Sequence, residues 1–396
     1  MQLLAREEAA QVEAYLGSML SAHADLKDLL EEMKTLYEKR LWHELTLKLE
    51  EAVALPKFQT GDLLVNLYHN FITDFEHRIS PLKLGHIAVA VSSRYADRLA
   101  AAQFMDDVIT KIADQKQRGH EEPILYLKMH VALLKVHEGA AADARKMIEE
   151  GKAALDALPS VDPSVSAAFH YVNAQYHKSK QHFSEFYRTG MLYLAYVSSD
   201  TLPAETRRDL AVDLSLAALL GDDSYDFAEL IAHPIMTAID DTAFAWLKSL
   251  VAAFNSGDMA AYDALCVKHA ASLNAQPALV ANERKLREKI TILCLLQILF
   301  ELPAECREIS IADIAARTKL GVDGVEYLLM KALSVRLIEG VIDQVEGKVN
   351  VTWVTPRVLL KPQIKELSVR LDGWIEKVKS VGESLQEEIP TLATMA

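Results

Sequence analysis

The sequence predicts a mainly α-helical protein with one small β-sheet near its C-terminal end. Three patterns lead to this prediction. Apolar residues recur at spacings of three and four through most of the chain before residue 305. Between residues 309 and 354 the period changes from 3.6 to 2, and this is the only stretch with a plausible sheet. Regular heptads, the third pattern, follow Pro356 and Pro362.

The first part of the chain is expected to be an arm of stacked helix pairs. Its apolar residues follow helical spacing in successive runs, among them 26–37, 63–75, 104–112, 124–134 and 191–195. Several of the short breaks carry helix caps. A Ser or Asp precedes a proline at 80–81 and 162–163, and at 255–258 a glycine ends one helix and an aspartate starts the next. Helices of about 12 to 20 residues joined by short turns, repeated over roughly 200 residues, are typical of a tetratricopeptide-like solenoid.

The most apolar run, residues 290–300, is expected to be a buried helix in a bundle that follows the arm. Thr291 and Gln297 interrupt it, and no apolar run reaches the roughly 18 to 20 residues that a bilayer span needs. Residues 1–20 mix Arg6 and three glutamates with alanines, which predicts an amphipathic helix and not a signal peptide. The sequence therefore predicts no membrane segment.

Charge and cysteine content narrow the functional classes. The chain has 396 residues, with 42 Lys and Arg against 56 Asp and Glu, and a net charge of −14. Because affinity for nucleic acids comes largely from cations on phosphates, this balance argues against a general polyanion binder. Cys266, Cys294 and Cys306 are far apart in sequence, so no disulfide framework is expected. A reducing compartment, the cytoplasm or the nucleus, fits best.

Residues 309–354 predict a winged-helix module. The turn between its two helices ends at Gly321, where a helix end favours a left-handed residue. After Ser334 the period becomes that of strands, and a turn around Gly347 is expected to join two of them. The predicted elements are a β-branched entry at 309–311, a helix that ends at the 318–321 turn, a second helix through 325–333, and strands at 337–342 and 349–353.

A winged helix invites a DNA-binding hypothesis, which the residues of the second helix oppose. In nucleic-acid readers this helix presents Arg, Lys, Asn or Gln to the base edges. Here Asp323 and Glu326 stand near its N-terminal end, and only Lys331 and Arg336 come later. Six basic residues between 309 and 357 are balanced by six acidic ones, which leaves no phosphate footprint.

The second strand of the wing offers an interaction site. Val349, Val351 and Trp353 are predicted on one face of the strand, and Asn350 and Thr352 on the other. One interpretation is that the apolar face covers the module's own helices, which is expected for at least two of the three residues. Another is that the edge of the short sheet pairs with a neighbouring subunit through main-chain hydrogen bonds. Both can hold at once, with side chains inward and the strand edge toward a partner.

The C-terminal helix carries a second interaction site. Its apolar residues alternate spacings of three and four over three unbroken heptads, the pattern of a coiled-coil or bundle seam. The seam residues are Ile364, Leu367, Leu371, Trp374, Val378, Val381 and Leu385. Their burial would contribute on the order of 10 to 20 kcal/mol gross, whereas association costs about 4 to 15 kcal/mol. The seam is therefore expected to support docking to other subunits; the alternative is that it folds back on its own chain.

No catalytic or cofactor-binding motif is found in the sequence. A His-Glu-x-x-His pair, a His-x-His followed by a distant Asp, a Cys-x-x-Cys pair, a phosphate loop after a strand and Gly-x-Ser-x-Gly are all missing. His170, His177 and His182 lie among aromatic residues on helices and are expected to be packing groups. We therefore predict a protein without enzymatic activity, metal or cofactor.

Six stretches of the sequence carry a resemblance to a known family. They are 36–47 (LYEKRLWHELTL), 67–78 (LYHNFITDFEHR), 227–234 (FAELIAHP), 253–258 (AFNSGD), 325–334 (VEYLLMKALS) and 353–358 (WVTPRV). The chain resembles a subunit of the 26S proteasome lid that belongs to the PCI family, which the lid shares with the COP9 signalosome and a translation initiation factor complex. The resemblance covers residues 30 to 375 and implies a right-handed helical-repeat arm, a helical bundle leading into the winged helix, and a C-terminal helix that joins a multi-subunit bundle.

The resemblance also suggests domain boundaries. It divides the chain into a helical-repeat arm at 1–175, a PCI domain at 176–355 and a C-terminal bundle helix and tail at 356–396. Within the PCI domain, the helical part is expected at 176–304 and the winged helix at 305–355.

The role that the resemblance implies is that of a non-catalytic scaffold. Its expected partners are other PCI subunits of the proteasome lid, reached through the winged-helix edge and the C-terminal helical bundle. The ubiquitin-receptor subunit and the lid deubiquitinase dimer are further candidates, and no nucleic acid or membrane is expected. A PCI scaffold of one of the sister complexes is the alternative.

Overall fold

The chain forms two compact units, Met1–Ser198 and Ser199–Ala396. The computed structural model describes residues 12, 14–20, 26–58, 61–114, 119–240, 242–302, 307–357 and 361–393. The expected domain boundary after residue 175 falls inside helix α10 (Pro163–Ser179), which packs against α11 (Phe183–Tyr196) of the same unit. The domain boundaries expected after residues 175 and 355 therefore remain predictions. Of the amphipathic helix expected at 1–20, residues 14–20 are helical, and most of the remainder lies outside the described residues.

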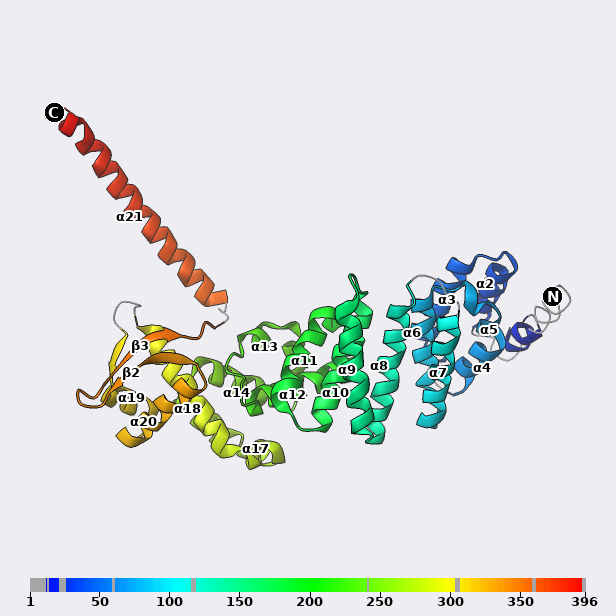
Figure 1. The fold of residues 1–396 in the computed structure, drawn as a ribbon, viewed down its shortest axis with the longest axis horizontal. Helices are drawn as coiled ribbons and strands as arrows, with labels where there is room; N and C mark the ends of the chain where they lie inside the picture. The colour runs from blue at the N-terminus through cyan, green and yellow to red at the C-terminus, as the bar shows by residue number, and fades with distance from the viewer. Residues whose placement is uncertain are drawn as a thin grey trace. The chain divides into compact units, whose positions relative to one another are not determined.

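The described part of the first unit consists of helices and turns (Figure 1). Before α10 its elements are α2 (Lys27–Glu38), α3 (Trp42–Ala54), α4 (Leu63–Leu67), the π-helix η2 (Tyr68–Ile72), α5 (Thr73–Phe75), the 3-10 helix η3 (Glu76–Arg78), α6 (Pro81–Ser92), α7 (Arg98–Asp114), α8 (Glu121–Glu138) and α9 (Ala141–Ala157). Helix α8 packs on α6, α7, α9 and α10, and these helices lie side by side in Figure 1. The pattern of helices joined by short turns is the one predicted.

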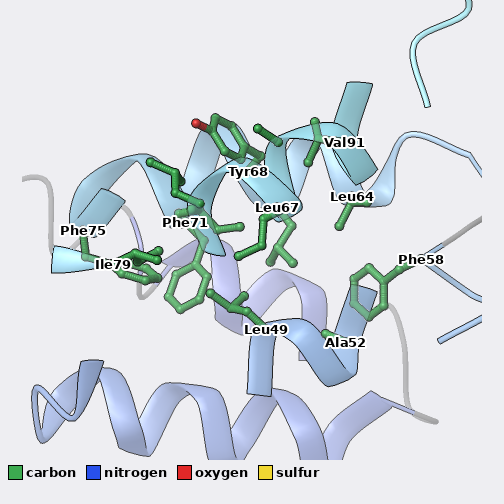
Figure 2. Close-up of a cluster of buried hydrophobic side chains, with 14 of the residues drawn as sticks. Leu49, Ala52, Phe58, Leu64, Leu67, Tyr68, Phe71, Phe75, Ile79 and Val91 are labelled. Carbon is green, nitrogen blue, oxygen red and sulfur yellow. The ribbon is translucent and has the colours of Figure 1, made fainter. Parts of the chain in front are cut away.

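Two of the stretches that carry the family resemblance pack against each other in the core of this unit. Phe71 and Phe75 are buried in this core (Figure 2), and their rings lie 5.1 Å apart. The ring of Trp42 from α3 stacks on Phe75 with the centroids 5.5 Å apart. The Tyr37 hydroxyl donates a hydrogen bond to the Asp74 carboxylate at 2.6 Å, which satisfies the polar end of a half-buried ring. The distinctive residues of these stretches thus serve packing.

Two of the three predicted N-cap residues, Asp162 and Asp258, make capping hydrogen bonds. The Asp162 carboxylate accepts the main-chain N–H of Ser164 at 2.8 Å, with Pro163 at the first helical position of α10. Ser80 stands in the corresponding position before α6, but its side chain makes no capping hydrogen bond.

The second unit is built around one long apolar helix. Its helices are η4 (Ser199–Thr201), α12 (Ala204–Leu220), α13 (Ala228–Ala232), η5 (Pro234–Ile239), α14 (Ala245–Ser256), α15 (Met259–Lys268), α16 (Ala270–Asn274), α17 (Pro277–Ala281), α18 (Glu283–Glu301), α19 (Ile311–Thr318), α20 (Val322–Ser334) and α21 (Lys361–Ala393). Helix α18 packs on α12, α14, α15, α19 and α20. Ile290, Leu293 and Leu295 on it are fully buried, which confirms the buried helix predicted at 290–300, although Phe300 at its end is 40% exposed.

A winged helix follows α18, as predicted. Strands β1 (Glu308–Ser310), β2 (Ile338–Asp343) and β3 (Lys348–Val354) form an antiparallel sheet in the order β1-β3-β2. Helices α19 and α20 lie between β1 and β2 in the chain, and both pack on α18. The mainly α-helical class with one small sheet is therefore confirmed.

The turn between α19 and α20 differs from the prediction. Lys319, and not Gly321, is the left-handed residue, with φ 57°. Helix α19 ends at Thr318, so the left-handed position that closes it comes directly afterwards. Gly321 has extended backbone (φ −72°, ψ 163°) because it is the N-cap residue of α20.

Candidate protein-assembly surfaces

Strand β3, which carries the five wing residues predicted to interact, is the central strand of the sheet. Its first residues pair with β1 on one side, and all its residues except Thr352 pair with β2 on the other. The Val351 N–H also donates to the Arg307 carbonyl at 3.0 Å. The main chain of Val349, Asn350 and Val351 is therefore used inside the module. The sequence did not reveal this, because β1 is only three residues long and two helices separate it from the wing.

A β-bulge changes the faces predicted for β3. Val349 and Val351 are 3% exposed, as expected for residues that cover the module's own core. Thr352 has no partner in the register of β2, and this extra residue reverses the alternation that follows it. Trp353 is therefore 41% exposed and Val354 takes the buried position. The prediction that Trp353 shares a face with the two valines is wrong.

Gly340 on β2 makes room for the bulge. A Cβ at this position would collide with the Asn350 carbonyl oxygen and lie 3.0 Å from the Val351 Cα. The Thr352 hydroxyl donates to the Glu339 carbonyl at 3.1 Å, which uses a main-chain acceptor beside the bulge. A glycine inside a strand pattern is the sequence signal that could have found this irregularity.

β1 and β2 are the two edge strands of the sheet, and β2, with six residues, provides the longer free edge. Main-chain groups of successive residues in an antiparallel ladder point alternately to the two sides. Because Val351 faces β1, Asn350 faces its partner Val341, and the main-chain groups of Gly340 and Ile342 point away from β3. Within the described part of the chain, no strand pairs with this edge, and the Val341 side chain is 70% exposed.

The outer face of α20 offers acidic and apolar groups. Asp323 lies in its first turn, and the Glu326 carboxylate accepts a hydrogen bond from the Gln344 side chain at 3.2 Å. Tyr327 and Met330 are more than half exposed. Such a surface suits a protein partner better than a phosphate backbone.

The heptad seam of α21 is exposed along its whole length. Its seven residues are between 44% and 65% exposed, and other described side chains from 364 to 385 are exposed or half-exposed as well. No other described part of the chain covers the seam. A helix with an open apolar seam is unfavourable in water and gains stability when a partner buries the seam.

The segment that leads into α21 is anchored by residues that the sequence reasoning did not single out. The Thr355 N–H donates to the Leu337 carbonyl at 2.9 Å. The Arg357 guanidinium donates to the Asn255 carbonyl at 2.9 Å, at the last turn of α14, where a cation is favourable. Burial lowers the pKa of Arg357, and the Asp226 carboxylate opposes this shift. The resemblance at 353–358 was the available signal.

Lys289 is a buried cation that fastens α18 to the end of α12. Its Nζ donates to the carbonyls of Ala218 and Gly221, both at 2.7 Å, and to that of Leu219 at 3.2 Å. The ring of Phe227 lies 5.1 Å from Nζ. Burial lowers the pKa of Lys289 to about 7. Because all three ammonium donors are used, this lysine stabilises the fold and is not available to a ligand.

The histidines that the sequence placed among aromatic residues lie in packing contacts. The His170 ring stacks on Tyr196 with centroids 5.6 Å apart, and the His177 ring lies 5.7 Å from that of His182. Burial lowers the pKa of His170 and of His177, which favours the neutral rings.

A search of the described residues finds no group of three or more His, Cys, Asp or Glu side chains that could hold a metal ion. None of the helices in this part of the chain is both long enough and apolar enough to cross a bilayer. Cys266 is half-buried and Cys294 is buried, and no disulfide joins the two; Cys306 lies outside the described residues.

Two family models match the chain. The model described as PSD13 N-terminal repeats covers residues 29–251, and the PCI domain model covers residues 267–353. The first match spans the helices of the first unit and continues into the second unit as far as α14, and the second match covers the winged helix up to residue 353. The helical-repeat arm and the PCI module expected from the sequence are confirmed.

Several curated proteins are similar along nearly their whole length. A 26S proteasome non-ATPase regulatory subunit 13 homolog B of Arabidopsis thaliana is 50% identical over 96% of this chain and 98% of its own. The subunit 13 of Dictyostelium discoideum is 36% identical over 92% and 94%, and a regulatory subunit of the Saccharomyces cerevisiae 26S proteasome is 31% identical over 95% and 97%. A translation initiation factor 3 subunit M of Neosartorya fischeri is 26% identical over 48% of this chain and 41% of its own. The chain belongs to the family of 26S proteasome non-ATPase regulatory subunit 13.

Proposed function

We propose that this chain is a non-catalytic scaffold subunit of the lid of the 26S proteasome regulatory particle, where it supports ubiquitin-dependent protein degradation. The observation that carries the proposal is the exposed heptad seam of α21, on a chain whose full-length relatives are named as proteasome subunits. A seam of seven apolar residues suits a bundle of helices from several subunits.

The free edge of β2 supplies a second assembly surface in this proposal. A partner strand laid beside it would bond the outward main-chain groups of Gly340 and Ile342 and cover Val341. On β3, the exposed side chains of Asn350, Thr352 and Trp353 remain available for contacts with the same partner. In this proposal β3 contributes side chains to the interface, and β2 contributes the free main-chain groups of its edge.

The partners proposed are other PCI subunits of the lid, through the β2 edge and the α21 seam. The ubiquitin-receptor subunit and the lid deubiquitinase dimer are further proposed neighbours. The corresponding locations are the cytoplasm and the nucleus. Similarity to full-length proteasome subunits supports this assignment.

The second candidate function is that of a PCI scaffold in a sister complex. This second function is favoured by the similarity of about half of the chain to a translation initiation factor 3 subunit. Purification of the endogenous chain separates the two functions. Proteasomal ATPases in the purified complex support the lid assignment, whereas ribosomes or cullins in their place would overturn it.

The seam can be tested with matched substitutions on one helix. Leu371→Glu with Trp374→Glu changes two seam residues, and Val369→Glu changes an apolar residue that is 64% exposed but lies off the seam. We expect the seam variant to fold and to fail to enter the lid, because all three positions are exposed in the free chain. The Val369 variant should enter normally. Equal incorporation of both variants would contradict the role of the seam.

The non-catalytic part of the proposal has its own test. The purified chain should show no peptidase or isopeptidase activity and no shift of DNA or RNA in an electrophoretic assay. Turnover of a substrate by the purified chain would refute it, provided that the activity persists when inhibitors of known contaminating proteases are added.

A further inference from the structure

A groove lies between α18 and the helix-turn-helix formed by α19 and α20. Its volume is about 480 Å³, which is within the range of pockets that bind small molecules or a few side chains. Met259 and Leu328 line it and are buried, whereas Leu320 and Tyr327 at its border are 37% and 60% exposed. No residue of the β2 edge or of α21 lines this groove. It is therefore separate from the two surfaces already proposed.

Basic side chains stand beside this apolar lining. Arg284 and Arg287 lie one turn apart on α18 and are exposed, and neither forms an ion pair with any side chain in the described ranges. Lys319 also lines the groove, with its Nζ 3.2 Å from the Asp263 carboxylate. The lining includes one carboxylate, that of Glu288. In a chain with a net charge of −14, this is a local excess of positive charge.

We propose that this groove binds a short acidic and apolar segment of a partner protein. Carboxylates of the segment would pair with Arg284 and Arg287, since a guanidinium binds a carboxylate through two parallel hydrogen bonds. An apolar side chain would enter between Leu320 and Tyr327 and cover Met259. The proposal does not depend on which multi-subunit complex the chain joins.

A nucleic acid is a poorer match for the same groove. Phosphates could pair with Arg284 and Arg287, but binding of a phosphate backbone leaves the apolar lining of Met259, Leu320 and Leu328 unused. A segment with both carboxylates and apolar side chains satisfies both features of the surface.

The test uses the purified full chain and a fluorescein-labelled peptide of alternating Asp-Glu pairs and Leu or Phe, followed by fluorescence anisotropy. Three comparison probes are a peptide with Ser in place of Leu and Phe, a peptide with Lys in place of the acids, and a single-stranded DNA. We expect saturable binding of the acidic apolar peptide in the micromolar range. The three comparison probes should bind at least about tenfold more weakly.

Variants locate the binding to the groove. Arg284→Glu with Arg287→Glu should weaken binding of the acidic apolar peptide at least about tenfold, and Tyr327→Ala should weaken it as well. Lys285→Glu is the control, because it makes the same charge change as each single arginine substitution, on the same helix, at a residue that does not line the groove. It should bind the peptide about as tightly as the unmodified chain.

Three results would overturn the proposal. They are no binding of the acidic apolar peptide below millimolar concentration, equal binding by the double variant and the Lys285 control, or tighter binding of the DNA than of the peptide. Circular dichroism of each variant is the check that it is folded. Because both arginines are exposed, their replacement is expected to leave the fold intact.

Discussion

At the scale of single residues, Gly257 decides how three helices meet. It lies between α14 and α15 with φ 66°, and Asp258 directly after it caps α15 by accepting the N–H groups of Ala260 and Ala261. A Cβ on Gly257 would lie 2.7 Å from the Leu293 carbonyl oxygen in α18. The sequence predicted the helix end and the cap. The close approach to α18 is a tertiary requirement that local sequence does not express.

Gly257→Ala is predicted to destabilise the second unit more than Gly347→Ala does. Both glycines have a left-handed backbone, but a Cβ on Gly347 would meet no atom within 4 Å. We expect a loss in the free energy of unfolding of about 1 kcal/mol for Gly347→Ala and about 2 to 5 kcal/mol for Gly257→Ala. Denaturant unfolding followed by circular dichroism measures both, and equal losses would show that the contact with α18 relaxes without cost.

His130 makes the stability of the first unit depend on pH. Its ring lies 4.7 Å from the Tyr126 ring, and its Nε2 is buried without a hydrogen-bond partner in the described part of the chain. Burial, with a smaller effect from His86, lowers the pKa of His130 to about 4. The unfolded chain binds this proton near its ordinary pKa of about 6.5. Stability is therefore full above about pH 6.5 and is lost as the pH falls toward 4.

His130→Phe is predicted to remove this part of the pH dependence. Between pH 7 and pH 5 the histidine lowers the free energy of unfolding by about 2 kcal/mol, and the variant lacks this loss because phenylalanine takes up no proton. Thermal or denaturant unfolding of both proteins at the two pH values gives the comparison. A variant that loses as much stability as the original chain over this interval would show that His130 is not the titrating group.

At the scale of elements, the winged helix shows which features sequence patterns predict and which depend on tertiary contacts. The two helices and the two strands of the wing followed from their periods, and the burial of Val349 and Val351 followed from the strand pattern. The central place of β3 did not, because it depends on pairing with the short strand β1 from before the helices. Asn350→Pro or Val351→Pro would therefore break the module's own sheet and cannot test an interaction edge cleanly.

Ile342→Pro is the sharper test of the free edge on β2. The Ile342 N–H points away from β3, so its loss should leave the module's own sheet intact but remove a donor that a partner strand would use. Val341→Pro, one residue away, removes an N–H that points to β3 and should destabilise the module. We expect the Ile342 variant to keep its circular dichroism spectrum and to lose incorporation into the lid. Normal incorporation would exclude pairing at this edge.

At the scale of the whole molecule, α21 contrasts with the remainder of the two compact units, residues 26–357. The units bury apolar cores, whereas the described side chains of α21 from 364 to 385 contact solvent. An isolated helix is only marginally stable in water, so α21 should open more readily than the remainder of either unit. The free chain is therefore expected to be least protected in the helix that carries the assembly seam.

Limited trypsin digestion is predicted to cut α21 before the remainder of either compact unit. Lys365, Arg370, Lys377 and Lys379 are exposed on it, and cleavage follows local opening. In the assembled lid the same sites should be protected, since a partner covers the seam. Mass spectrometry of the early fragments measures this. First cuts within residues 26–302 of the free chain, or cuts in α21 at the same rate in the assembled complex, would contradict the prediction.

The sequence by itself determined the features that depend on local periodicity and capping. These are the helical class, the buried run in α18, the caps at Asp162 and Asp258, the wing and the seam of α21. Only the tertiary structure decided the position of β3 in the sheet, the bulge that exposes Trp353, the lysine clamp of Lys289 and the groove beside Arg287. Each of these depends on contacts between segments far apart in the chain, and spacing along one segment carries no information about which distant segment will lie against it.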